Sequence, residues 1–480
     1  MIPRERLKEH PTQGSGTHGG PPLRTVLLVL AAITSLYCYR LGTWPWDHDE
    51  VLSLAEVGVV APDAFPGPRD QVAKLAQLLP VWALIQSSAL RVLPHDELGA
   101  RLVPTACGVA VVVWSFVLGW RWRGSLFAWS LLAMVGGSQL MIWLSQQNRF
   151  YPIALLGLLA TTAQVLSPTR SPVRALYGAS LAALTMLTHA LALVPLGLMA
   201  IASTTMTILA RGSRTVLVRS WAVALTALMV YATHSRPIIA GWISGTTGGT
   251  SPLVSLLAQV GIPTLAFAFF GACAVIGGAR TENSARWWTI VAVLSLLFAA
   301  AVPLLLRNWN PRYALFLVPP LWVVAALGVE TVLRGLPSSG LQIALLLAVL
   351  ALQAPKLASH LLDGSRHDFR SAATVVAQAN SGGLPVYSNW PATLQYYLSS
   401  ARTRQVTDWP ASDAVGRCPC FVVLGTNLWQ PVLTVPGAQV TVLAEIRTRR
   451  LDEQSHVVRV YRLDPAEARR GGDEAGGSGR

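Results

Sequence analysis

Charged side chains are scarce in this sequence. Only 12% of its 480 residues are Asp, Glu, Lys or Arg, whereas 52% are hydrophobic. Soluble domains carry about twice that charged fraction. The shortage of charge excludes an ordinary soluble protein, and the mean hydropathy of +0.47 favours an α-helical polytopic membrane protein.

Cysteine is also rare, with five residues in the chain. Cys38, Cys107 and Cys273 lie within apolar runs, which leaves Cys418 and Cys420 as the pair in a polar region. So few cysteines exclude a disulfide framework. A C-x-C pair is a weak signal that is more often structural than redox-active.

Acidic residues number 23 against 37 basic ones, and the net charge is +14. The basic residues are spread over short loops between apolar runs and form no stripe with interleaved aromatic residues. This distribution argues against nucleic acid as a partner. It is typical of loops that encode the orientation of a membrane protein.

Apolar runs that are long enough, or nearly long enough, to cross a bilayer predict about eleven transmembrane helices. The uncharged stretch 174–210 is too long for one helix and is divided at Thr188–His189. The first run resembles a signal peptide but lacks small-residue cleavage chemistry, so we expect an uncleaved anchor. The runs are 24–39, 99–120, 125–145, 150–167, 174–188, 190–210, 216–234, 253–278, 287–306, 312–333 and 340–356.

Loop cations alternate along the chain and predict the orientation of the spans. The connections that we expect in the cytoplasm are the N-terminus, 121–123, 169–174, 211–219, 280–286 and 334. Those that we expect outside are 145–150, 189, 235–252 and 307–312. The pattern predicts a multi-pass protein of the plasma (inner) membrane with a cytoplasmic N-terminus and an extracytoplasmic C-terminus.

The segment 74–93 resembles a span, but Pro80, Gln86, Ser87 and Ser88 weaken it. A full span here would invert the charge alternation in everything that follows. We therefore expect 41–98 to be one long extracytoplasmic loop with interfacial helices near 50–60 and 74–93.

The composition changes after residue 356. Short β-type runs at 385–387, 420–424, 439–443 and 456–461 alternate with helical patterns at 369–379 and 391–399. This alternation predicts a small extracytoplasmic α/β domain over 357–465. The expected organisation is a disordered cytoplasmic N-terminus (1–23), a transmembrane domain (24–356), this α/β domain and a disordered tail (466–480).

The stretch WPWDHDEV directly follows the first span and holds Asp47, His48, Asp49 and Glu50. Charge beside hydrocarbon is costly unless it is paired or hydrated, so such a cluster is a functional hypothesis by default. The alternative is a solvated loop flanked by interfacial tryptophans, Trp44 and Trp46. Asp47, His48 and Asp49 are also candidate ligands of a divalent metal.

Further polar residues gather on the outer face that the topology predicts. Carboxylates beside several cations suit a reaction in which a base activates a nucleophile while a phosphate leaves. Arginine binds phosphate oxygens bidentately, which favours it over lysine. The residues are Lys74, Gln146, Gln147, Asn148, Arg149, Tyr151, His189, Arg307, Asn308, Asn310, Arg312 and Tyr313.

Structural alternatives exist for several of these residues. A single arginine at a span end can be an interfacial anchor whose charged tip reaches water. For His189, a packing role is favoured over a catalytic one. Asp96 and Glu97 precede a span with Arg101 nearby, so a helix-start and ion-pair role suffices for them.

Five segments, in this order, resemble the GT-C glycosyltransferases that use polyprenyl-phosphate-linked sugars, such as protein O-mannosyltransferases and lipid A aminoarabinose transferases. TWPWDHDEVLSLAEV is similar to the first-loop segment with its Asp-Glu pair, and IWLSQQNRFYPIALL is similar to a Tyr-Ser-Gln-Glu-Ala-Arg-x-Tyr segment. The other three are LLPVWALIQSSALRVLPHDELGARLVPTACG, LTHALAL and NPRYALFLVPPLWVVAALG. The resemblance covers roughly residues 24–330.

The resemblance implies an inverting hexosyl- or pentosyltransferase of the cell envelope. Asp49 corresponds to the catalytic aspartate and Glu50 to its acidic neighbour. Asp49 would then be the general base, while Arg149, Arg312 and Lys74 would hold the phosphate of the donor lipid. The wider set of substrate-binding candidates is Lys74, Gln147, Arg149, Tyr151, His189, Arg307, Arg312 and Tyr313.

The chain departs from the family pattern at two places. Gln147 and Asn148 replace the usual Glu-Ala, so a carboxylate of the second outer loop is missing, and Leu79 replaces a proline before Pro80. These departures bear on metal binding and on the class of acceptor. The sequence identifies neither the sugar nor the acceptor, which could be a lipid, a glycan or a protein.

Two other functions are compatible with the sequence. A transporter or lipid flippase would show internal repeats and charges at mid-membrane in broken helices, whereas the ionisable residues here lie at span ends. A catalytically inactive relative whose outer domain is a binding module is the second alternative.

Overall fold

The computed structural model describes most of the chain outside its two ends and several loops. The described residues are 20–46, 50–51, 53–54, 79–167, 169, 171–209, 212–236, 251–278, 283–305, 311–363, 366–398, 407–408, 419–427, 433–435, 438–448 and 456–465. The disorder predicted for 466–480, that predicted for 1–23 up to residue 19, and most of the helix predicted near 50–60 lie outside them. Residues 50, 51, 53 and 54 of that predicted helix are helical.

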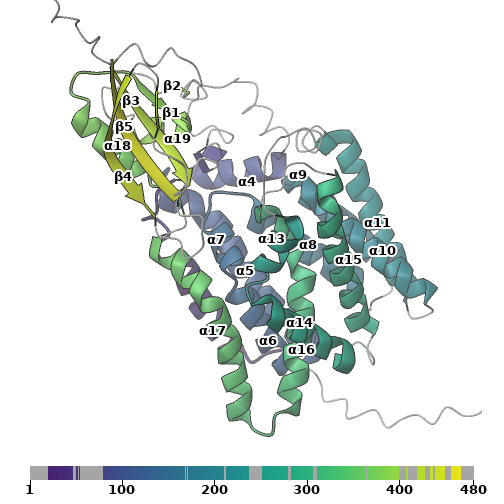
Figure 1. The fold of residues 1–480 in the computed structure, drawn as a ribbon. Coiled ribbons are helices and arrows are strands. Elements are labelled where there is room, and N and C mark those ends of the chain that lie inside the picture. The colour runs from purple at the N-terminus through teal and green to yellow at the C-terminus, as the bar shows by residue number, and fades with distance from the viewer. Residues whose placement is uncertain are drawn as a thin grey trace, which may run out of the picture.

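The chain forms a helical bundle with a small sheet domain at one end (Figure 1). The helices of the bundle follow the predicted apolar runs. They are α1 (Leu23–Cys38), α4 (Pro80–Leu90), α5 (Glu97–Arg123), α6 (Ser125–Gly136), α7 (Gln139–Ser145), α8 (Tyr151–Leu166), α9 (Pro172–Thr188), η2 (Ala190–Ala192), α10 (Leu193–Ile208), α11 (Arg214–Val230), η3 (Tyr231–Ser235), α13 (Pro252–Gln259), α14 (Thr264–Cys273), η4 (Ala274–Gly278), α15 (Asn283–Leu305), η5 (Pro311–Phe316), α16 (Val318–Gly335) and α17 (Ser339–Asp363).

Six of the described helices are long and apolar enough to cross a membrane, or up to eight if each of two bent helix pairs is one span. The pairs are α6 with α7, bent by 59°, and α13 with α14, bent by 75°. Ser138 caps the start of α7, where its hydroxyl accepts a hydrogen bond from the amide of Met141. In the second pair the break holds Gly261, which has φ +95° and so adopts a conformation that glycine tolerates best.

The helix α4 is too short to cross a bilayer. Its 11 residues extend roughly 16 Å at 1.5 Å per residue, about half of a hydrocarbon core. Figure 1 shows it lying across the end of the bundle beside the sheet domain. The ambiguous segment 74–93 therefore contributes a short helix over Pro80–Leu90, and its residues 74–78 lie outside the described residues.

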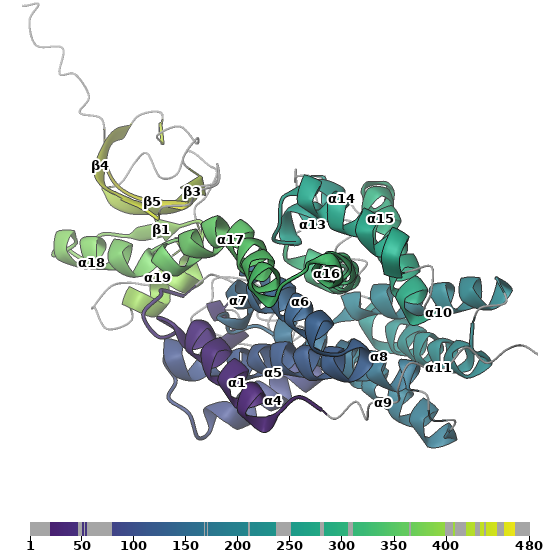
Figure 2. The ribbon, with the colours of Figure 1, turned by 90° about the horizontal axis from the view of Figure 1, so that it is seen from below.

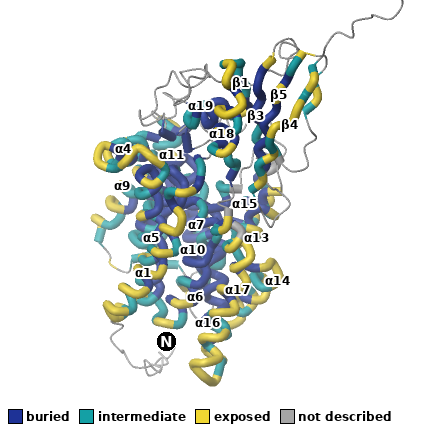
Figure 3. Tube along the Cα trace, turned by 90° about the vertical axis from the view of Figure 1, so that its left-hand side faces the viewer, coloured by how far each residue is buried: buried dark blue, intermediate teal, exposed yellow. Residues whose placement is uncertain are grey.

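Burial in the bundle is graded from its axis outwards (Figure 3). α16 is the most enclosed of the span-length helices. In its most apolar stretch 72% of the residues are buried, whereas in that of α17 only 11% are buried. An apolar helix that is exposed in the chain alone is expected when lipid is the solvent. Leu, Val, Phe, Met and Trp side chains from the long helices form the core of the bundle. The outer face of α17 takes no part in it.

The C-terminal domain is a five-stranded mixed sheet with two helices. The strand order is β2-β1-β3-β5-β4; β2, β1 and β3 are parallel, whereas β3, β5 and β4 are antiparallel. Figure 2 shows both helices on one face of the sheet. The elements are α18 (Phe369–Ala379), β1 (Val386–Ser388), α19 (Pro391–Leu398), β2 (Thr407–Asp408), β3 (Cys420–Asn427), β4 (Ala438–Arg447) and β5 (His456–Pro465).

Alternation along β3 explains why this sheet is covered on both faces. Phe421 and Val423 pack with Phe369 and Val376 of α18, whereas Cys420 and Val422 face a second cluster on the other side. Successive residues of a strand point to opposite faces, so one strand serves both cores. The helices and strands predicted for 357–465 are confirmed as elements. Cys420 is a buried residue of β3, and Cys418 lies outside the described residues.

A small core joins the sheet domain to the bundle. Trp46, Val51 and Leu54 of the first loop pack with Leu90 and Ala100 of the bundle and with Ala392 of α19. Trp46 is fully buried and Trp44 is 2% exposed. The interpretation of these tryptophans as interfacial anchors is therefore wrong, because both are enclosed where the two parts of the chain meet.

Candidate functional site

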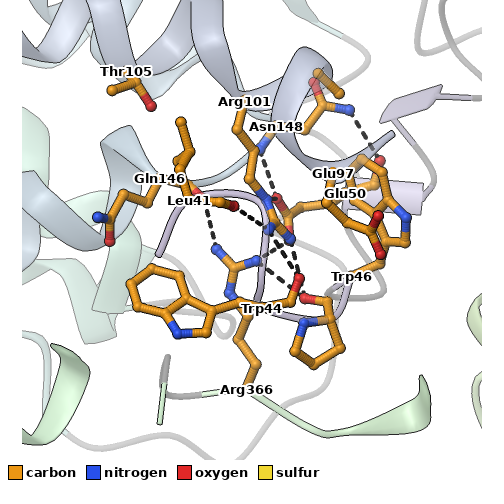
Figure 4. Close-up of polar contacts among 12 residues, drawn as sticks. Leu41, Trp44, Trp46, Glu50, Glu97, Arg101, Thr105, Gln146, Asn148 and Arg366 are labelled. Atoms are coloured by element: carbon orange, nitrogen blue, oxygen red, sulfur yellow. Dashed lines mark hydrogen bonds and ion pairs between the residues drawn. The ribbon is translucent and has the colours of Figure 1, made fainter. Parts of the chain in front are cut away.

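Glu50 lies at the centre of a buried polar cluster (Figure 4). Its side chain is fully buried, and its carboxylate accepts four hydrogen bonds from described residues. Oε1 accepts from Nε of Arg101 at 2.8 Å and from the backbone N–H of Asn148 at 2.7 Å. Oε2 accepts from Nη2 of Arg101 at 3.0 Å and from Nη1 of Arg366 at 2.6 Å. Two arginines against one carboxylate offset the cost of burying its charge.

Arg101 also fixes the backbone of the first loop. Its Nη1 donates to the carbonyl oxygens of Leu41 and Trp44 at 2.9 and 3.0 Å, and its Nη2 donates to that of Pro45 at 3.0 Å. The guanidinium lies 5.0 Å from the centroid of the Trp46 ring. This buried arginine, near the start of α5, therefore holds the segment that leads directly to residues 47–49.

The linker between the bundle and the sheet domain supplies the second arginine. Arg366 is 1% exposed and donates to the carbonyl oxygens of Gln146 at 2.7 Å and Pro45 at 3.2 Å, besides its bond to Glu50. It thus connects the first loop, the turn after α7 and the C-terminal domain through one side chain.

A second contact between the domains lies at the start of α5. Glu97 accepts from Arg370 of α18 at 2.5 Å and from the Tyr397 hydroxyl of α19 at 3.1 Å. The same hydroxyl accepts from the amide of Trp46 at 2.6 Å, and burial raises the pKa of Tyr397 above its usual range. Asp96 caps α5, since its carboxylate accepts from the amide of Gly99. The predicted helix-start role of Asp96 is confirmed, while Glu97 pairs with Arg370 and Arg101 pairs with Glu50.

The turn after α7 presents three consecutive amide side chains, and two of them are fully engaged. Gln146 donates to the carbonyl oxygens of Tyr37 and Tyr39 at 2.9 and 3.3 Å, and its Oε1 lies 2.7 Å from Nε2 of His360. Asn148 accepts from Nε2 of Gln86 at 2.8 Å and donates to the backbone oxygen of Glu50 at 3.3 Å.

Gln147 differs from both neighbours. It is fully buried, and neither atom of its side-chain amide has a hydrogen-bond partner among the described residues. Its backbone carbonyl accepts from the amide of Arg149 at 2.7 Å, which tightens the turn. A buried polar group without a partner costs about 1–3 kcal/mol, so this amide is a costly feature of the ligand-free chain.

An aromatic cluster surrounds His189 in the connection between α9 and η2. Its ring stacks on Phe316 with centroids 4.7 Å apart and an interplanar angle of 19°, and lies 4.7 Å from Phe150 and 5.6 Å from Tyr151. Its Nδ1 accepts from the amide of Leu191 at 3.1 Å. Burial, and then the nearby charge of Arg149, lower the pKa of His189 to about 3. The packing role that we favoured for this histidine agrees with these contacts.

Two half-buried arginines border this cluster. Arg149 donates to the Ser53 hydroxyl at 2.9 Å, and its guanidinium lies 4.7 Å from the centroid of Phe150. Arg312 lies over Trp143 of α7 at 5.1 Å from the ring centroid. Tyr313, the next residue of η5, lies with its ring centroid 6.4 Å from that of His189. Stacking on aromatic faces holds both guanidinium planes in position beside this cluster.

The structure brings together the predicted site residues that it describes, namely Glu50, Gln147, Arg149, Tyr151, His189, Arg312 and Tyr313. Seven other predicted residues lie outside the described residues: Asp47, His48, Asp49, Lys74, Arg307, Asn308 and Asn310. Within the described part of the chain no three His, Cys, Asp or Glu side chains are grouped so as to hold a metal ion.

Sequence reasoning missed Arg366 and gave Arg101 a different partner. Arg366 lies in a polar linker, 316 residues from Glu50, and nothing local marks it as buried. Arg101 did carry a signal, because a charged residue four positions inside the start of an apolar span is costly unless it has a buried partner.

A cavity of about 670 Å³ lies inside the bundle beneath the aromatic cluster. Leu155, Phe316 and Pro319 line it at the end near His189, and Arg121, Ser213 and Asn283 line it at the opposite end. Along α8 the lining extends from Leu155 to Leu166, roughly 16 Å at the helical rise. Its walls are mostly Leu, Val, Met, Phe and Trp side chains, so it suits an apolar chain rather than a polar solute.

The bundle, its bent spans and the C-terminal sheet domain define a multi-pass membrane protein with a GT-C-like fold. The chain is similar to the crystal structure of ArnT from Cupriavidus metallidurans in the apo state, with a TM-score of 0.53 and 13% identity over 91% of this chain and 98% of that one. The structure of the same protein bound to undecaprenyl phosphate gives a TM-score of 0.50 over 92% and 98%.

An archaeal oligosaccharyltransferase from Archaeoglobus fulgidus also matches, with a TM-score of 0.47 and 12% identity over 80% of this chain and 64% of that chain. No protein-family model matches the sequence, and no curated protein sequence matches it. At such low identity the likeness to ArnT establishes the fold. It confirms the predicted resemblance to polyprenyl-phosphate-dependent GT-C glycosyltransferases at that level.

Proposed function

We propose that this protein is an integral membrane glycosyltransferase that moves a sugar from a polyprenyl monophosphate donor to an extracytoplasmic acceptor. The observation that carries the proposal is the site at one end of a GT-C-like fold. There a fully bonded Glu50, directly after Asp49 in the chain, lies beside Arg149 and the His189 cluster.

In the proposed reaction Asp49 is the general base. Its carboxylate takes the proton of an acceptor hydroxyl or amine, whose lone pair attacks the anomeric carbon of the sugar as the bond to the phosphate oxygen breaks. Attack opposite the leaving group inverts the anomeric centre. Arg149 and Arg312 neutralise the charge that builds on the departing polyprenyl phosphate. Lys74 and Arg307 are further candidates for that role.

We assign Glu50 a positioning role in this scheme rather than a proton transfer. Each of its two oxygens already accepts two hydrogen bonds, and three of these four bonds come from guanidinium groups. Guanidinium neighbours favour the ionised form of a carboxyl group. A carboxylate held in this way fixes the position of residue 50, which directly follows Asp49 in the chain.

We further propose that the end bearing the sheet domain faces outside and that eleven spans cross the membrane. Support comes from the loop cations, since Arg121 and Arg123 end α5 at the end of the bundle opposite to Glu50. The apolar cavity beneath His189 suits part of the lipid chain of the donor, because its walls match hydrocarbon and Phe316, which lines its upper end, stacks on His189.

The test is transfer of label from a radiolabelled polyprenyl-phosphate sugar by the purified protein. Wild type should move label from donor lipid to an acceptor fraction of membrane lipid, glycan or protein. Asp49→Asn should fold and bind donor yet lose turnover by about 10²-fold or more, the usual range for removing a general base.

Asp47→Asn is the matched control and should lose much less. If Asp49 only caps a helix, its substitution would lower thermal stability with turnover intact. That result would end the general-base assignment. Absence of transfer from every donor by wild type would contradict the proposed function itself.

A further inference from the structure

The three amides after α7 are equally buried but unequally used. The side chains of Gln146 and Asn148 form hydrogen bonds with protein groups from four segments of the chain. Gln147 lies between them with both amide atoms unsatisfied among the described residues. Single unsatisfied side-chain atoms occur elsewhere in this interior, among them Oε1 of Gln86. Within the described residues, however, Gln147 alone has two side-chain polar atoms without a partner, and it is therefore the position that calls most strongly for a ligand.

The position of Gln147 joins it to the site proposed above. The preceding residue is tied to Arg366 through its carbonyl, and the following residue is tied to Glu50 through its amide. Its own carbonyl accepts from the amide of Arg149. The backbone that carries this amide is therefore fixed in the turn that supplies Arg149.

The hydrogen-bonding capacity of the Gln147 amide indicates which part of a lipid-linked sugar it can bind. Its oxygen accepts and its NH₂ donates, so complete satisfaction needs a ligand that both donates and accepts. A phosphate only accepts and would leave Oε1 unsatisfied. A sugar hydroxyl pair does both. An ammonium group on the sugar would meet the positive field of Arg149 and Arg312 with no carboxylate from this position to offset it.

We propose that Gln147 binds hydroxyl groups of the donor's sugar and selects a neutral sugar over an amino sugar. This inference rests on the proposed function. Gln147 is a specificity-determining residue in this scheme, and the phosphate is left to the arginines.

The experiment measures binding of two lipids, a polyprenyl phosphate that carries a neutral hexose and the bare polyprenyl phosphate, to wild type and to Gln147→Leu. Affinity for the hexose lipid should fall about tenfold or more, because substrate hydroxyls lose their partner, whereas affinity for the bare phosphate should stay within about twofold. The ligand-free variant should melt no lower than wild type, since it buries leucine in place of unsatisfied polar atoms.

Asn148→Leu is the structural control and should melt lower, because it leaves Gln86 with one bond fewer. A comparable drop in melting temperature for Gln147→Leu, or an equal loss of affinity for both lipids, would overturn the inference. A wild-type preference for an amino-sugar lipid over the hexose lipid would do the same. If wild type binds neither the hexose lipid nor the bare phosphate, the proposed function fails instead.

Discussion

At the scale of single residues, burial decides which ionisable groups take part in chemistry. Glu50 and His189 both come from segments with a functional signature, yet both are enclosed and engaged with protein groups. Two guanidinium groups, of Arg101 and Arg366, pair with the Glu50 carboxylate. His189 lies among aromatic rings beside a cation, so the neutral imidazole is favoured.

The state of His189 gives a prediction of pH dependence. The folded protein holds this imidazole neutral down to about pH 3, whereas the unfolded chain takes up a proton below about 6.5. Protons bound only by the unfolded state favour unfolding, so this residue lowers stability as pH falls below 6.5, by up to about 1.4 kcal/mol per pH unit.

Thermal unfolding of wild type and His189→Phe between pH 7.5 and 5 measures this effect. The difference in melting temperature between the two proteins should shift in favour of the variant as pH falls. A difference that does not change with pH would contradict the neutral, buried imidazole.

At the scale of elements, the linker between α17 and α18 couples the sheet domain to the first loop. Arg366 bonds to Glu50 at 2.6 Å with both side chains fully buried, whereas the neighbouring pair of Arg370 and Glu97 has 41% of the arginine side chain exposed. Buried and exposed pairs differ widely in what their loss costs.

Arg366→Met should therefore destabilise the protein by about 3 kcal/mol, the lower end of the range for breaking a buried pair, since Arg101 remains. Arg370→Met is the matched control, four residues further along the chain in α18. It should lower the free energy of unfolding by about 1 kcal/mol or less. Thermal unfolding in detergent measures both. Turnover should also fall in the Arg366 variant, since the backbone before Asp49 loses a support. Equal losses of stability in the two variants would show that the buried ion pair contributes no more than the exposed one.

At the scale of the whole molecule, the two ends of the bundle carry different groups. α5 begins beside Glu50 and the sheet domain and ends at Arg121 and Arg123, and Arg123 there pairs with the buried Glu330 at 2.7 Å. Single cysteines labelled with an impermeant maleimide in intact cells should react at a position in the sheet domain, such as Thr441, and not at position 121. Strong labelling at position 121 would reverse the orientation and contradict the site assignment.

The sequence by itself determined the membrane class, the helices in the apolar runs, the strands and helices of 357–465, and the gathering at one end of those predicted site residues that the structure describes. These depend on local composition, periodicity and caps such as Asp96, which act within a few residues. The bends within 125–145 and 253–278 were harder to foresee, because glycine and serine are ordinary in membrane helices.

Only the tertiary structure decided how the gathered residues are used. Glu50 meets Arg101 across 51 residues and Arg366 across 316, and no local pattern encodes such pairings. The same holds for the amides after α7. Three similar side chains in sequence become two structural anchors and one unsatisfied group, because hydrogen bonding in an interior depends on which distant atoms packing brings within about 3 Å.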